Sequence, residues 1–211
     1  MHALPTLTDD LFAPAMIQLV DDAEGGIRYW PDVIQPVTAR AWFDTLQSRA
    51  AWTHLQRPMY DRIVDVPRLL ANYAVDALPN DLPLAELLAC VQAKAPAPYS
   101  RIGMNLYRNG DDSVAMHGDK LHTVSAGHPI TLVSLGAPRR MLIRAREGRR
   151  ETLAVDLMPG SVLSMSHASQ RTHEHGIPKT RRAQGPRISV VFRVRPASPV
   201  GVGVVAGVGA T

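Results

Sequence analysis

The sequence predicts a mixed α+β fold that is mainly β, with helices packed on an antiparallel sandwich or jelly roll. Apolar residues recur at helical spacing in residues 37–52, through Ala41, Phe43 and Leu46, and again in residues 80–95. After Tyr99 the chain changes to short β-rich runs separated by turn residues. Helices followed by many short strands are typical of helices that cover one face of an antiparallel sheet.

The expected elements follow in chain order. A short strand begins at Ile27, and the second helix ends before Pro96, because proline cannot continue a helix. Turn signals such as Asn109-Gly110 and Pro159-Gly160 separate the later strands. These strands are expected at residues 101–108, 113–119, 129–135, 140–146, 152–157, 161–165 and 187–195.

The pattern divides the chain into three parts. Residues 1–26 are expected to form a poorly specified N-terminal arm, and residues 27–195 a single domain. Within that domain, residues 27–100 hold the helices and residues 101–195 the β core. Residues 196–211 are rich in glycine and valine, so we expect a flexible tail.

The composition is that of an ordinary globular protein. The chain has 211 residues, 45% of them hydrophobic, and a formal net charge of +4, an excess of positive charge that allows a polyanionic partner without requiring one. The single cysteine, Cys90, excludes an internal disulfide and fits a reducing cytoplasm. No secretory signal or membrane span is apparent, and we expect a cytoplasmic monomer.

A metal site is the first chemistry that the residues indicate. His117 and Asp119 flank Gly118 in an expected strand, so their side chains share one face. Two imidazoles and one carboxylate on one face of an iron form the facial triad of non-haem Fe(II) oxygenases, although such donors do not exclude zinc or manganese. The missing side chain of Gly118 would leave room near the metal. The third ligand is expected among His167, His173 and His175.

A pair of arginines indicates an anionic co-substrate. Arg187 and Arg193 lie on one face of the last expected strand. Burying both is costly unless anions answer them, and a dicarboxylate such as 2-oxoglutarate would do so. The alternative is a pair of surface arginines on an edge strand. Asn105 and Tyr107 share a face in the same way and could donate hydrogen bonds to a carboxylate or ketone oxygen.

The ordered motifs resemble the AlkB family of Fe(II)/2-oxoglutarate dioxygenases from about residue 27 to residue 195. The resemblance rests on Asn105-Leu-Tyr-Arg-Asn-Gly, His117-Gly-Asp, Ser134-Leu-Gly-Ala-Pro-Arg, Gln170-Arg-Thr-His-Glu-His-Gly-Ile-Pro-Lys and Pro186-Arg-Ile-Ser-Val-Val-Phe-Arg. It implies a double-stranded β-helix, a jelly-roll core with a nucleotide-recognition lid in residues 27–100.

The resemblance also assigns roles to single residues. His175 becomes the third metal ligand, because in this family that ligand directly precedes Gly-Ile-Pro-Lys. Arg187 would bind the distal carboxylate of 2-oxoglutarate, and Arg193 would lie beside its 1-carboxylate and Asp119. The polar pair Asn105 and Tyr107 would complete the co-substrate site.

The implied reaction is oxidative demethylation of N-alkylated bases, such as 1-methyladenine and 3-methylcytosine, in DNA or RNA. It uses Fe(II), 2-oxoglutarate and O2 and releases formaldehyde and succinate. The alternatives are a 2-oxoglutarate-dependent hydroxylase of modified tRNA or of a small molecule, and a non-catalytic metal-binding barrel.

Substrate contacts are expected in the first half of the chain. The target base must leave its stack, which calls for a wedge, and the resemblance places Tyr60 there, assisted by Met59. Arg68 is expected to contact phosphate. Relatives commonly carry an acidic residue shortly after the aspartate ligand, whereas this chain continues Lys120-Leu121-His122. This departure bears on the identity of the substrate rather than on the metal.

Overall fold

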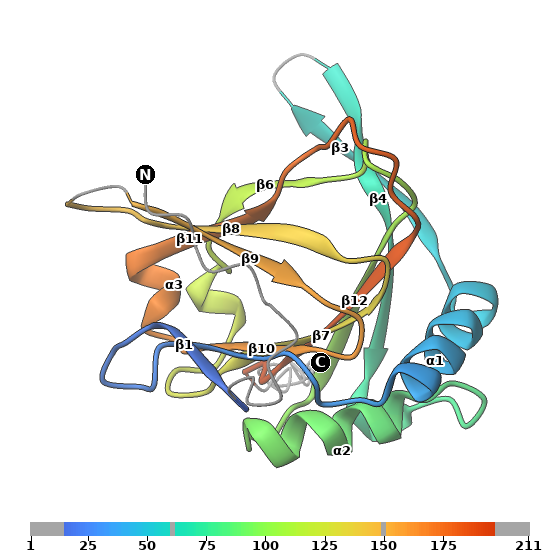
Figure 1. Ribbon diagram of the computed structural model, residues 1–211, viewed down its shortest axis with the longest axis horizontal. Coiled ribbons are helices and arrows are strands. Elements are labelled where there is room, and N and C mark those ends of the chain that lie inside the picture. Colours follow the sequence, from blue (N-terminus) through green and yellow to red (C-terminus); the bar gives the residue numbers. More distant parts are fainter. Residues whose placement is uncertain (1–14, 60–61, 149–150, 197–211) are drawn as a thin grey trace, which may run out of the picture.

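The computed structural model describes residues 15–59, 62–148 and 151–196, with the side chains of residues 57–64 left out of that description. Two antiparallel sheets face each other in it, as a jelly roll requires, and helices cover the outer side of the larger sheet (Figure 1). The expected fold class is confirmed. The predicted tail lies outside the described residues apart from Pro196, so its flexibility stays a prediction.

Eight strands form the large sheet and four form the small one. In spatial order, the large sheet contains β1 (Ile17–Val20), β2 (Ile27–Trp30), β10 (Val162–Met165), β7 (Ile130–Gly136), β12 (Arg187–Arg193), β5 (Arg101–Tyr107), β4 (Arg62–Ala74) and β3 (Thr53–Met59). The small sheet contains β6 (Val114–His117), β11 (His173–Ile177), β8 (Arg139–Ala145) and β9 (Thr152–Leu157).

The two long helices form where apolar spacing predicts them. α1 (Pro36–Arg49) starts with proline in its first turn, where no helical N–H bond is lost. α2 (Leu84–Lys94) ends at Ala95, directly before Pro96. A third helix, α3 (Ser169–Thr172), and two 3-10 turns, η1 (Val75–Ala77) and η2 (Leu121–Thr123), are short. None of the helices in these described ranges is long and apolar enough to cross a membrane.

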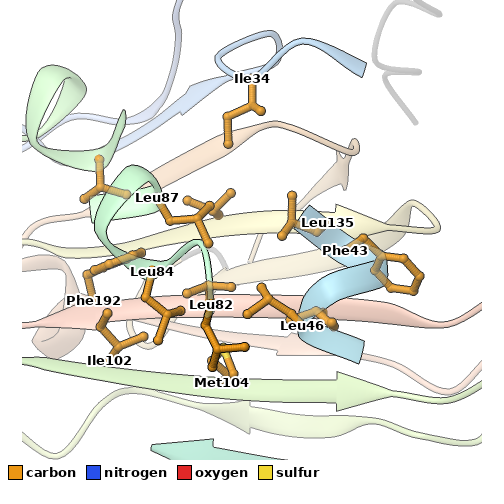
Figure 2. Close-up of a cluster of buried hydrophobic side chains, with 14 of the residues drawn as sticks. Ile34, Phe43, Leu46, Leu82, Leu84, Leu87, Ile102, Met104, Leu135 and Phe192 are labelled. Carbon is orange, nitrogen blue, oxygen red and sulfur yellow. The ribbon is translucent and has the colours of Figure 1, made fainter. Parts of the chain in front are cut away.

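Two apolar clusters fill the molecule. The first lies between the two long helices and the large sheet, where Leu84 and Leu87 meet Ile102 and Phe192 (Figure 2). The second lies between the two sheets and includes Tyr107 and other inward-facing side chains. The large sheet is therefore buried on both faces, and the inner face is the one available for a site.

Three segments differ from the expected division. The second half of the expected arm forms β1, which pairs with β2 inside the domain. β4, in the region expected to form the lid, continues the main sheet beside β5. β11 was not expected as a strand, because its sequence His-Glu-His-Gly-Ile is polar and contains glycine; pairing with β6 and β8 on its two sides makes it one.

Candidate active site

The alternation predicted for the last strand is confirmed. Ile188, Val190 and Phe192 of β12 are fully buried against the helices. The alternate residues of β12, such as Val191, face the space between the sheets. Arg187 is on this face and is only 1% exposed. The charged Arg187 side chain is therefore buried, on a strand that lies between β7 and β5. The alternative that Arg187 is a surface residue of an edge strand is excluded.

Within the part of the chain that the structure describes, no carboxylate is paired with the Arg187 guanidinium. Its Nε donates to Ser134 Oγ at 2.9 Å, and its carbon lies 5.3 Å from the centroid of the Tyr107 ring. Its two terminal nitrogens are buried without a hydrogen-bond acceptor among the described residues. Burial lowers the pKa of Arg187 to about 10, so the group still carries its charge at neutral pH. A buried cation with two unused donors suits a carboxylate, which can accept both.

A second arginine, Arg139, which the sequence pattern did not indicate, lies beside the same tyrosine ring as Arg187. The Arg139 guanidinium carbon is 5.5 Å from the Tyr107 ring centroid, and its charge lowers the pKa of Arg187 further. Its two terminal nitrogens donate to three backbone carbonyls, those of Asn109, Asp112 and Pro178. Arg139 thus adds positive charge beside Arg187, whose terminal nitrogens keep the unused donors. The only sequence signal was its place in the Ser134-Leu-Gly-Ala-Pro-Arg motif.

Two of the predicted metal ligands meet across a strand pair. His117 in β6 lies directly opposite His175 in β11, with ring centroids 4.6 Å apart. Burial, and then the nearby His117, lower the pKa of His175 to about 4. The imidazole of His175 is therefore neutral at physiological pH, which is the form that binds a metal.

The third predicted ligand is held by an arginine. Asp119 accepts hydrogen bonds from Arg193 Nε at 2.7 Å and from Arg193 Nη2 at 3.2 Å. Burial opposes ionisation of Asp119, but Arg193, His175 and His117 together keep the pKa of its carboxyl below the usual value. Among the described residues, no three His, Cys, Asp or Glu side chains stand close enough together to hold one ion. The structure thus brings the imidazoles of His117 and His175 together. The Asp119 carboxylate is bound to Arg193 and is close enough to both rings for them to lower its pKa.

The space beside Gly118 is filled, so the expectation that this glycine leaves room near a metal is wrong. A Cβ at this position would lie 2.7 Å from the carbonyl oxygen of Gln170 and 2.7 Å from Arg146 Nη2. The carbonyl comes from α3, and Arg146 directly follows β8. Gly118 and Asp119 themselves lie beyond the end of β6 (Val114–His117), so the strand expected to carry both His117 and Asp119 ends before Asp119. Glycine is needed here because another backbone approaches closely.

The other two histidines considered as ligands lie elsewhere. The Nδ1 of His173 is 2.9 Å from Thr172 Oγ1, and His173 pairs with Ala145 in β8. His167 is buried before α3, at 7% exposure.

Of the predicted co-substrate and substrate residues, Asn105 and Arg68 contact each other. Arg68 Nε donates to Asn105 Oδ1 at 2.8 Å, and Arg68 Nη1 donates to the carbonyl oxygen of Ser113 at 3.0 Å. Arg68 therefore braces β4 against β5, and its contact with phosphate stays a prediction. Tyr60 and the side chain of Met59 lie outside the described residues, so their predicted role also stays a prediction.

Comparison with known proteins gives the class that this fold and site define. Residues 73–193, more than half of the chain, match the 2OG-Fe(II) oxygenase superfamily, and the chain belongs to that superfamily. The match includes every residue predicted here to bind metal or co-substrate. Fe(II) and 2-oxoglutarate are the cofactors of this superfamily.

The resemblance to the AlkB family is also confirmed. The chain is 31% identical over 97 residues to the human DNA oxidative demethylase ALKBH2, covering 43% of this chain and 37% of that protein. It is 25% identical over 146 residues to the mouse alpha-ketoglutarate-dependent dioxygenase alkB homolog 3, covering 65% of this chain and 51% of that protein. The aligned part thus spans about a third to a half of these relatives.

Solved structures support the fold. The structure of OsALKBH1 superposes with a TM-score of 0.56 at 16% identity, over 81% of this chain and 97% of that one. A 2OG-Fe(II) oxygenase family oxidoreductase from Burkholderia pseudomallei superposes with a TM-score of 0.52 at 15% identity, over 80% and 85%.

In the chemistry of their donor groups, the residues present fit both cofactors of the superfamily. Arg187 offers two buried, unused donors to a carboxylate. Two neighbouring imidazoles, one held neutral by burial, and an ionised aspartate provide the nitrogen and oxygen donors that suit Fe(II).

Proposed function

We propose that this protein removes N-linked methyl groups from bases of DNA or RNA by oxidation, with Fe(II), 2-oxoglutarate and dioxygen. The observation that carries the proposal is the buried Arg187 guanidinium with two unused donors, because such a group serves an anion and adds nothing to a core. The similarity to the DNA oxidative demethylase ALKBH2 supports the choice of substrate.

Arg187 would bind the distal carboxylate of 2-oxoglutarate through its two terminal nitrogens. Ser134 fixes the guanidinium through Nε, and the Tyr107 ring packs against it, so the donors are oriented before the ligand arrives. Arg193 would lie by the 1-carboxylate, since it already holds Asp119 near the two imidazoles. Asn105, held by Arg68, would complete the co-substrate site.

His117, Asp119 and His175 would hold the iron. When bound, Fe(II) lets dioxygen oxidise both partners: one oxygen atom enters succinate as carbon dioxide leaves, and the other enters the methyl C–H bond. The hydroxymethyl product then loses formaldehyde and leaves N–H on the base. The chain's own part is to present the neutral imidazole of His175 beside His117, to keep Asp119 ionised through Arg193, and to orient the co-substrate.

The substrate would reach this site beside the β3–β4 hairpin, which projects from the body of the sheets (Figure 1). Residues 53–56 at its base are exposed. We propose that Tyr60 and Met59 of this hairpin separate the target base from its neighbours, and that Arg68 supports β4, the second strand of the hairpin, by its hydrogen bond to Asn105 in β5. An alkylated nucleic acid is the partner that this arrangement would accept.

One departure from the family pattern favours a second candidate substrate. Lys120 and His122, which follow Asp119 where relatives commonly carry an acid, are exposed and flank the start of η2. Lys120 can only donate hydrogen bonds to a base, whereas the carboxylate of an acidic residue would accept them. A different alkylated base, a modified tRNA or a small molecule is therefore the alternative, with the same cofactors.

The test is turnover of a panel of methylated oligonucleotides, with mass spectrometry of the bases and a formaldehyde assay. We expect demethylation of 1-methyladenine or 3-methylcytosine that requires both Fe(II) and 2-oxoglutarate. Demethylation that persists without 2-oxoglutarate would refute the proposal. Inactivity on every methylated DNA, beside turnover of modified tRNA or a small molecule, would favour the second candidate.

A further inference from the structure

The segment that carries His117 and Asp119 rests on one buried side chain from α3. Gln170 is 4% exposed, and its Oε1 accepts a hydrogen bond from the backbone N–H of Asp119 at 2.9 Å. The main-chain carbonyl of the same residue lies directly behind Gly118, where a Cβ would meet it at 2.7 Å. Gln170 therefore contacts two consecutive residues of the His-Gly-Asp segment, one by a hydrogen bond and one by close packing.

The residues before α3 are held in turn by the N-terminal acidic turn. Asp22 Oδ2 accepts a hydrogen bond from Ser166 Oγ at 2.6 Å, and Glu24 Oε2 accepts one from the Ala168 N–H at 2.8 Å. Ser166 Oγ also accepts the N–H of Ser169 at 2.9 Å, at the start of the helix. These contacts fix the backbone from which Gln170 extends, so its amide is a rigid support.

The backbone N–H of Asp119 depends on Gln170 for its hydrogen bond. After β6 the chain leaves the ladder of the small sheet, so no strand partner is available to the amide of Asp119. A half-buried N–H without an acceptor is costly, and the segment would shift to find water. The carboxylate of Asp119 would then move away from Arg193, which holds it within electrostatic reach of His117 and His175.

Resting on the proposed function, we propose that Gln170 is a positioning residue for the metal site: it sets the backbone of Asp119, and thereby the carboxylate that completes the ligand set. It touches neither metal nor substrate in this role. Outer-shell partners of metal ligands typically change metal affinity by about 10- to 100-fold when removed, and we expect an effect of that size here.

The test uses Mn(II) as a probe for the iron site, titrated into metal-free full-length protein with 2-oxoglutarate, and reads free Mn(II) by electron paramagnetic resonance. Gln170→Met keeps the length of the side chain and removes the amide oxygen. We expect Mn(II) binding about 10-fold weaker or more, with an unchanged circular dichroism spectrum. Gln170→Asn, which keeps the amide but shortens it by one methylene, should show the same loss.

A matched control separates positioning from general loss of stability. Thr131→Val removes a buried hydroxyl that is hydrogen-bonded to Tyr99 and Ser164 in another part of the core. We expect a lower melting temperature with wild-type Mn(II) affinity. Wild-type affinity in Gln170→Met, or in Gln170→Asn if the first variant does not fold, overturns the inference, as does an equal loss of affinity in Thr131→Val. Failure of the wild-type protein itself to bind Mn(II) would instead overturn the proposed function, and the inference with it.

Discussion

At the scale of single residues, the site is defined by charges that are buried at a cost. Arg187 keeps its charge in the interior with a serine and an aromatic ring as its neighbours, and no acid of the described residues is paired with it. His175 stays neutral because burial and a second imidazole oppose protonation. The buried charge of Arg187 lowers the stability of the free protein and suits an anion. The neutral imidazole of His175 is instead the form that binds a metal.

Arg187→Met should therefore separate binding from stability. Loss of a buried charged partner typically costs 2–5 kcal/mol of binding, so 2-oxoglutarate affinity should fall by about 30-fold or more. The melting temperature of the ligand-free protein should stay the same or rise, because a buried cation without an anion is replaced by an apolar side chain. Calorimetric titration and differential scanning fluorimetry measure the two effects.

Arg140→Met is the matched control, since Arg140 is exposed and paired with Asp156 at 2.8 Å on the same barrel. It should bind 2-oxoglutarate as the wild type does. A large fall in melting temperature in Arg187→Met, with affinity unchanged, would show that Arg187 serves the fold.

The pKa of His175 predicts how stability depends on pH. The folded value is about 4, against an ordinary 6.5, so between these values the unfolded chain binds a proton that the folded protein does not. The free energy of unfolding should fall as pH falls through this window. In metal-free protein, wild type should lose about 2 kcal/mol more between pH 7 and pH 5 than His175→Gln does.

Urea unfolding at several pH values measures this difference. Equal slopes in wild type and His175→Gln would contradict the account of a buried, neutral imidazole.

At the scale of elements, the two faces of β12 could be predicted from the sequence, whereas the contact between α3 and the segment that follows β6 could not. Strand alternation alone places Arg187 inward and Phe192 toward the helices, because a period of two fixes both faces. The role of Gly118 depends instead on a carbonyl from α3, which is a contact between segments distant in sequence. Local pattern carries no information about such an approach, and for this reason the expectation of an open space was wrong.

Gly118→Ala tests the contact between β6 and α3. The added Cβ would meet the Gln170 carbonyl at 2.7 Å, and backbone atoms cannot move away as a flexible side chain can. We expect destabilisation of about 1–3 kcal/mol, as for overpacking in cores, together with weaker metal binding. Gly185→Ala is the control, because its Cβ would meet only Ala137 Cβ at an ordinary 3.4 Å. Equal unfolding free energies in the two variants, by urea denaturation, would contradict the close approach.

The β3–β4 hairpin carries the prediction about substrate form. Tyr60 is expected to act as the wedge, so Tyr60→Ala should lower turnover of a methylated base in duplex DNA by about 10-fold, the rate equivalent of 1.4 kcal/mol. Turnover of the same base in a single strand should change little, because no partner strand has to be displaced. Equal losses on both substrates would contradict a role in base extraction.

At the scale of the whole molecule, the sequence was sufficient for the fold class and for most elements of the β core. Motifs spread over residues 105–193 come together because antiparallel pairing sets Arg187 opposite Tyr107, and His117 opposite His175. The acidic turn at Asp22 was not predicted to be part of the domain, since its partner Ser166 lies 144 residues away. Arg139 was also missed, because only the fold brings it beside Tyr107.

The central claim is that the buried Arg187 guanidinium and the two facing imidazoles serve one reaction on a methylated base. The most direct measurement is the ratio of succinate to formaldehyde formed by the purified wild-type protein with Fe(II), 2-oxoglutarate and a methylated oligonucleotide. The account predicts equal amounts of the two products, and loss of both in His175→Ala and at low 2-oxoglutarate in Arg187→Met. Base demethylation that continues in His175→Ala, or that yields formaldehyde without succinate, would contradict it.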